Sequence, residues 1–184
     1  MAFALAGIPG IAMAEEVNLD GRWVVNYELS DDTDIQVEKA IKAAGGRIRD
    51  TGKKGRGRYK GGPPEQELYD HLSYDEVLVI RRDKPRFLFS YDEGFEREFF
   101  SDNRGRSVSA SSLQSGERHD YAFAYWDNGK LVVEARPRDG GKTHETYHLD
   151  PATGQLNVEL ELRPLTFLQP VQIRRVYDRM QDDK

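Results

Sequence analysis

His144, Glu145 and His148 stand in the order His-Glu-x-x-His, which has the composition of a zinc site. On a helix, side chains four residues apart share one face about 6 Å from each other. Two such histidines can bind one zinc ion while the glutamate between them acts as general base. This chemistry would be that of a zinc metallopeptidase, and it depends on the element that carries the motif.

Residues 142–149 are predicted to form a strand, because they are rich in threonine and tyrosine and lie between two turn-forming groups. These groups are Asp139-Gly140-Gly141 and Pro151-Ala152-Thr153-Gly154. On a strand the two histidines would lie about 13 Å apart, and Glu145 would point to the opposite face. We therefore predict no metal site, no catalytic residue and no cofactor, and a zinc metallopeptidase is the least favoured alternative. The sequence also contains no nucleophile elbow, phosphate-binding loop or dinucleotide fingerprint.

A second group of chemically interesting residues is expected on the inner face of a sheet. Arg97 stands between Phe95 and Phe99, so an inward strand face would bury its guanidinium together with Glu145. Such a cluster could bind a carboxylate or another anionic head group, or it could be a structural ion pair that closes the fold. The candidate ligand-binding residues are Arg97, Trp126, Glu145, Tyr147 and Arg175.

Residues 47–60 form the strongest charge feature, with seven basic residues and one acidic residue in a chain of net charge −5. This segment has no apolar periodicity, so we expect residues 45–63 to be a flexible loop. It could contact polyanions, with anionic lipid head groups favoured over nucleic acid, or it could be a solvated loop attracted to the acidic remainder. The basic residues are Arg47, Arg49, Lys53, Lys54, Arg56, Arg58 and Lys60.

The first 14 residues have the character of an export signal. They carry no charge and end in Ala12-Met13-Ala14, the small-x-small pattern of signal peptidase cleavage, after which Glu15 and Glu16 follow. We therefore expect residues 1–14 to be a signal peptide, although an apolar tail or a first strand is the alternative. A periplasmic or secreted location follows from this expectation.

Composition limits the remaining possibilities. The chain has 184 residues, 38% hydrophobic and 32% charged, which is typical of one globular domain, here 15–184. It contains no cysteine, which excludes disulfides, cysteine nucleophiles and thiolate metal sites. It also has no apolar run of about 18 residues, so no membrane-spanning helix is expected.

Hydrophobic patterns and turn residues predict mainly β structure. The pattern predicts a strand over 22–29, then a helix over 34–44, and then a second, short helix over 64–73. Turns rich in glycine, proline, asparagine and aspartate then separate nine further segments. The predicted strands are 75–82, 86–91, 95–101, 107–112, 119–126, 130–136, 142–149, 155–162 and 170–178.

Three hairpins agree on a single interior. With Asn128-Gly129 as a two-residue turn, one face of the first hairpin is purely apolar, and the next two loops extend it. Tyr121, Phe123 and Tyr125 then lie on the opposite face, where we expect the helix 34–44 to cover them. The predicted inner pairs are Trp126–Leu131, Ala124–Val133, Ala122–Ala135, Ala135–Thr143, Val133–Glu145, Leu149–Leu156 and Tyr147–Val158.

This order of elements, with Gly21-Arg22-Trp23 on the first strand, resembles the calycin superfamily and above all the fatty-acid-binding arrangement. Residues 126–134 and 174–179 are similar to a group of exported proteobacterial proteins with lipocalin-like barrels. The resemblance implies an antiparallel meander of about ten strands that closes into a calycin-like barrel, with one or two short helices between the first and second strands.

The leading hypothesis for function is a periplasmic, non-enzymatic barrel that binds a small hydrophobic or amphiphilic ligand. The alternative is a protein that binds a component of the cell envelope through its outer face or its basic loop. Neither hypothesis involves nucleic acid.

Overall fold

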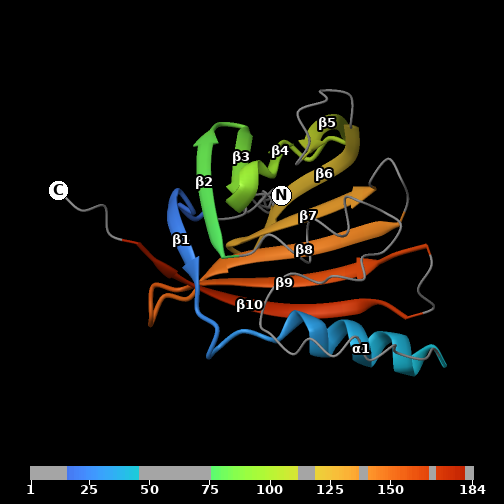
Figure 1. Ribbon diagram of the computed structural model, residues 1–184. Helices are drawn as coiled ribbons and strands as arrows, with labels where there is room; N and C mark the ends of the chain where they lie inside the picture. The colour runs from blue at the N-terminus through green and yellow to red at the C-terminus, as the bar shows by residue number, and fades with distance from the viewer. Residues whose placement is uncertain (1–15, 46–75, 112–118, 137–140, 166–168, 181–184) are drawn as a thin grey trace, which may run out of the picture.

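The computed structural model (Figure 1) describes residues 16–45, 76–111, 119–136, 141–165 and 169–180. The expected signal peptide (1–14), the basic residues 47–60 and the expected second helix (64–73) lie outside these ranges. In the part of the chain that is described, no helix is long and apolar enough to cross a membrane.

Ten antiparallel strands of the described chain form one closed barrel, as the meander pattern predicts. Each strand pairs with its neighbours in sequence, and β1 closes the barrel by pairing with both β2 and β10. The strands are β1 Gly21–Val25, β2 Val77–Asp83, β3 Arg86–Tyr91, β4 Glu96–Phe100, β5 Arg106–Ser111, β6 His119–Asp127, β7 Lys130–Arg136, β8 Lys142–Leu149, β9 Leu156–Arg163 and β10 Val171–Arg179.

The predicted register of the three hairpins is confirmed. All seven predicted pairs occur in the ladders from β6 to β9. Most of these residues are fully buried, while Trp126 and Leu149 are partly buried against the same core. The alternation of residue types therefore determined which face turns inward, because a shift by one residue would have placed charged side chains there.

The helix α1 (Thr33–Ala43) follows β1 and lies beside β10 (Figure 1). Its side chains Val37 and Ala40 belong to the same buried cluster as the inward residues of the strands. The expectation that this helix covers the aromatic residues of β6 is wrong. Tyr121 is 54% exposed, because the short connection after β1 keeps the helix next to β10, on which Arg174 O accepts a hydrogen bond from Asp31 N.

The first strand is shorter than predicted and ends at Val25. The Asn26 side-chain oxygen accepts hydrogen bonds from the backbone N–H groups of Glu28 and Leu29, and the Asn26 carbonyl accepts one from Ser30 N. This local bonding replaces the ladder and turns the chain. A 3-10 turn, η1 (Asp92–Gly94), joins β3 to β4, at a place where a turn is predicted.

The barrel has two different ends. The turns at Asn128–Gly129 and Asp150–Gly154 lie at one end, which the segment before β1 also crosses, since Glu16 pairs with Lys84 and Val17 lies near Gly129. There Leu19 is fully buried and its carbonyl accepts a hydrogen bond from Trp23 Nε1. The helix α1 and η1 belong to the other end, because β1 and β3 both run towards it. We call these the turn end and the helix end.

Candidate functional site

Arg97 and Glu145 come from strands that are not neighbours. Arg97 lies on β4 and Glu145 on β8, with β5, β6 and β7 between them in the sheet. Both side chains point inward, as predicted, since each lies among the buried residues that alternate along its strand. Their ion pair therefore joins two opposite walls of the barrel.

The ion pair is two-pronged and completely buried. Arg97 Nη1 donates to Glu145 Oε2 at 2.6 Å, and Arg97 Nη2 donates to Oε1 at 2.8 Å. The exposed fraction of the side chain is 1% for Arg97 and 0% for Glu145. Parallel hydrogen bonds between a planar guanidinium and a carboxylate are the strongest form of this interaction and fix the geometry of both groups.

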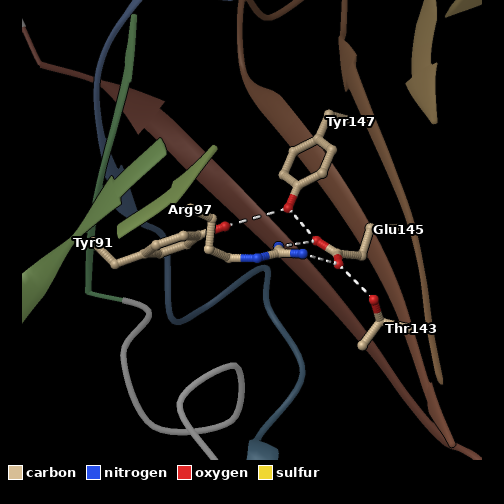
Figure 2. A network of polar contacts seen from close by, with 5 residues as sticks. All are labelled: Tyr91, Arg97, Thr143, Glu145 and Tyr147. Carbon is tan, nitrogen blue, oxygen red and sulfur yellow. Dashed lines mark hydrogen bonds and ion pairs between the residues drawn. The ribbon is translucent and has the colours of Figure 1, made fainter. Parts of the chain in front are cut away.

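Two further hydroxyl groups complete the coordination of the carboxylate (Figure 2). Thr143 Oγ1 donates to Glu145 Oε1 at 2.9 Å, and Tyr147 Oη donates to Oε2 at 2.5 Å. The Tyr91 hydroxyl on β3 lies 3.3 Å from that of Tyr147. Each carboxylate oxygen thus accepts two hydrogen bonds. We call these five residues, Tyr91, Arg97, Thr143, Glu145 and Tyr147, the clasp.

Burial and charge shift the pKa values of the clasp. Burial alone disfavours a charged Arg97, but the Glu145 carboxylate with Tyr91 and Tyr147 outweighs it and holds the pKa of Arg97 well above its ordinary value. Burial, followed by the nearby Glu145 charge, raises the pKa of Tyr147 well above its ordinary value. Burial likewise raises the pKa of Tyr91. The arginine is therefore charged and the two tyrosines are neutral hydrogen-bond donors over the physiological range.

Aromatic rings surround the clasp. The Phe89 ring meets the Tyr147 ring edge to face at 5.0 Å and the Phe99 ring at 4.7 Å. The Arg97 guanidinium lies 4.9 Å from the centre of the Phe99 ring, and Tyr91 stacks on Phe95 at 5.1 Å. These rings exclude water from the ion pair and so strengthen it.

The other predicted inner residues are placed differently. Arg175 is buried and pairs with Val158, which in turn pairs with Tyr147, so it lies in the same row of the inner face and has interaction partners of its own. Trp126 does not reach the clasp. It lies beside the turn at Asn128–Gly129, with its ring 6.2 Å from that of Phe87, at the turn end of the barrel.

The sequence did not indicate Tyr91 and Thr143 as members of the site. The alternation along β8 places Thr143 on the inner face two residues before Glu145, so the sequence predicts its position but not its role. Tyr91 is the last residue of β3 and faces inward because it pairs with buried Leu78. Only the meeting of β3 with β8 across the interior brings its hydroxyl to Tyr147.

The His-Glu-x-x-His segment is the strand β8, as predicted. His144 is half-exposed on the outer face, with Nδ1 3.7 Å from Glu134 Oε1, whereas Glu145 is fully buried on the inner face. Among the described residues no group of three potential ligands could hold a metal ion. The helical geometry that a shared zinc ion and an adjacent general base require is not formed by this segment.

No protein-family model matches the sequence, and no curated protein is significantly similar to it. Solved structures are similar in fold. The lipid binding protein 8 of Caenorhabditis elegans superposes with a TM-score of 0.52 at 16% identity, covering 88% of this chain and 94% of that one. Human cRBP IV gives 0.49 at 14% identity (89% and 99% covered), and secretory abundant heat soluble protein 4 of Ramazzottius varieornatus gives 0.49 at 14% (88% and 94%). The first of these similarities shows that the chain shares the barrel fold of the lipid binding protein.

Proposed function

We propose that this protein is an exported, non-enzymatic barrel that binds a small hydrophobic or amphiphilic ligand on its inner face. The observation that carries the proposal is the buried clasp on an inner face whose other described residues are mostly apolar. Binding sites for small molecules are lined by apolar and aromatic side chains with a few precisely oriented polar groups. The clasp places such groups in the half of the barrel towards the helix end.

The distribution of side chains supports a ligand that enters from the helix end. At the turn end, Leu19, Trp23 and Phe87 are fully buried, and the segment before β1 crosses them. The clasp residues Arg97 and Thr143 lie close to the other end, near the first residues of β4 and β8. A ligand would then place its polar group against the clasp.

The state of Glu145 supports a binding role rather than catalysis. A general base needs a free lone pair within reach of the proton that it removes. Both oxygens of Glu145 already accept two hydrogen bonds each from Arg97, Thr143 and Tyr147. Its hydrogen bonds favour a fixed, charged acceptor.

Native mass spectrometry of protein purified from the periplasm tests the proposal. We expect a stoichiometric adduct with the mass of a lipid or another small amphiphile, which organic extraction removes and readdition restores. A bare polypeptide that also fails to bind environment-sensitive fluorescent amphiphiles would contradict a binding function. A stoichiometric bound metal ion would instead favour the discounted metallopeptidase.

The proposal that the protein is exported can be tested separately from ligand binding. Cleavage after Ala14 would leave a chain beginning at Glu15 and would preserve the ion pair of Glu16 with Lys84. N-terminal sequencing of the protein from the periplasm should therefore begin Glu-Glu-Val. An intact Met1 in that fraction would argue against a cleaved signal.

A second candidate function, binding of a cell-envelope component, is favoured by the outer face of β6. Tyr121 is 54% exposed, and the rings of Phe123 and Tyr125 lie 5.4 Å apart on the same strand. Cosedimentation with isolated envelopes should then fall with Tyr121→Ala, and not with Tyr27→Ala, whose side chain is similarly exposed. Deletion of residues 47–60 tests the basic segment separately.

A further inference from the structure

We propose that the ligand carries an uncharged polar head and that Glu145 is the residue that sets this preference. The inference rests on the proposed ligand-binding function and adds the chemical class of the ligand. The Glu145 carboxylate accepts hydrogen bonds from the Arg97 guanidinium in the way that a ligand carboxylate would. The protein thereby supplies its own counter-charge.

The Glu145 carboxylate already occupies the edge of the Arg97 guanidinium that carries the two Nη groups, so a second carboxylate cannot bind this edge. Both Nη groups donate to Glu145, at 2.6 and 2.8 Å. An incoming anion would have to displace Glu145, which would leave that carboxylate buried without its cation. Thr143 and Tyr147 would also lose the acceptor to which they donate. A buried charge without a partner is strongly unfavourable, so this exchange disfavours anionic ligands.

An anion that bound beside the intact ion pair would add a negative charge to a group that is already neutral. Such an anion would be buried without a counter-charge, which is strongly unfavourable. The other buried guanidinium of the described chain, that of Arg175, is engaged in interactions as well. The two charges of the clasp are thus compensated by each other.

The Nε–H group of Arg97 is a donor of the clasp that remains for a neutral ligand atom. Arg97 Nε is buried and has no hydrogen-bond acceptor among the described residues. A hydroxyl, carbonyl or ester oxygen can accept from this N–H without introducing charge. Such a bond would satisfy a buried donor that is otherwise costly. Because the charges of Arg97 and Glu145 compensate each other and Arg97 Nε has a free N–H, we expect an alcohol, ester or similar neutral amphiphile to bind.

The test compares two probes that differ in charge and by one methyl group, 11-(dansylamino)undecanoic acid and its methyl ester, titrated by fluorescence at pH 8. The native protein should bind the ester more than tenfold tighter than the acid. In Glu145→Gln the freed charge of Arg97 should shift this acid-to-ester preference at least tenfold towards the acid. Glu159→Gln removes an exposed carboxylate from the neighbouring strand and should leave the preference as in the native protein.

A double variant covers the case in which Glu145→Gln does not fold. Arg97→Gln with Glu145→Gln removes both charges together, so it should bind the ester without any gain in affinity for the acid. A native protein that prefers the acid, or a folded Glu145→Gln variant with unchanged preference, would overturn the inference while leaving ligand binding intact. Failure of the native protein to bind either probe would instead overturn the proposed function, and the inference with it.

Discussion

At the scale of single residues, the most demanding feature is a charge pair placed entirely inside the barrel. Arg97 and Glu145 lose nearly all contact with water, and in its place they have their mutual hydrogen bonds and, for Glu145, those from the hydroxyls of Thr143 and Tyr147. Removing water from two ions is expensive, so each partner depends on the other for its stability. The pair is therefore a sensitive point for both stability and ligand choice.

Breaking this pair should cost far more than removing it. We expect Glu145→Leu to lower the free energy of unfolding by about 3–5 kcal/mol, because Arg97 would remain buried and charged without its partner. Arg97→Met with Glu145→Leu should restore most of that loss, since two apolar groups of similar size need no counter-charge. Urea denaturation measures both. Equal destabilisation by the single and double variants would contradict the coupling.

Tyr147 contributes a separate hydrogen bond to the same carboxylate. Its hydroxyl donates to Glu145 at 2.5 Å from a fully buried ring. We expect Tyr147→Phe to lower the free energy of unfolding by about 1.5–3 kcal/mol, the usual contribution of a hydrogen bond to a charged group. Thermal and urea unfolding provide the measurement. An unchanged stability would mean that this bond contributes nothing to the native state.

His148 should make the protein sensitive to mild acid. Burial, followed by the charge of Lys130, lowers the pKa of His148 below its ordinary value of 6.5. The unfolded chain then binds a proton more readily than the folded one, so stability should fall as the pH decreases from about 6.5 towards the folded-state pKa. His148→Gln should flatten the dependence of the urea midpoint on pH in this window. A variant that follows the native profile would exclude His148 as the cause.

At the scale of elements, the helix α1 depends on a local signal and on a tertiary one. Asp32 caps its N-terminus by accepting a hydrogen bond from Ile35 N at 3.1 Å. Val37 and Ala40 attach it to the barrel core. The sequence contained both signals, the cap and the apolar spacing, but the identity of the surface it covers came from the path of residues 26–31 along β10.

Loss of the cap should weaken this helix measurably. We expect Asp32→Ala to lower the free energy of unfolding by about 1 kcal/mol, because Ile35 N would lose its side-chain acceptor. Asp32→Asn, which retains an accepting oxygen, should remain close to the native stability. Denaturation curves of the two variants distinguish a capping effect from a general effect of changing this residue.

At the scale of the whole molecule, the barrel is asymmetric along its axis. The segment before β1 crosses the turn end, where Glu16 pairs with Lys84 and Leu19 is fully buried. The clasp occupies the half towards the helix end. A closed antiparallel barrel has no free strand edges, so the difference between its two ends decides where a ligand can enter.

The buried Leu19 should make this segment an integral part of the fold. We expect Leu19→Ala to lower the free energy of unfolding by about 2–5 kcal/mol, as for other leucines in closely packed cores. Leu165→Ala provides the control, because that side chain is 75% exposed and its loss should change stability by less than about 0.5 kcal/mol. A similar small effect at both positions would show that the segment is only loosely attached.

The sequence by itself determined most of the β structure. Alternating residues and turns such as Asn128-Gly129 specified the strands, and three hairpins specified the register and the inner face, all of which the structure confirms. These features are local, because a period of two and a tight turn constrain residues close together in the chain. The same information placed Arg97 and Glu145 inward and made His-Glu-x-x-His a strand.

Tertiary structure alone decided how the walls of the barrel meet. Nothing in the alternation of β3, β4 and β8 states that Tyr91 and Arg97 reach Glu145 and Tyr147, because inner residues on non-adjacent strands have no fixed spacing in sequence. The same holds for α1, whose spacing predicted an apolar face but not the strand beside it. Long-range packing across a closed barrel depends on its curvature and closure, and these are properties of the assembled sheet rather than of any segment.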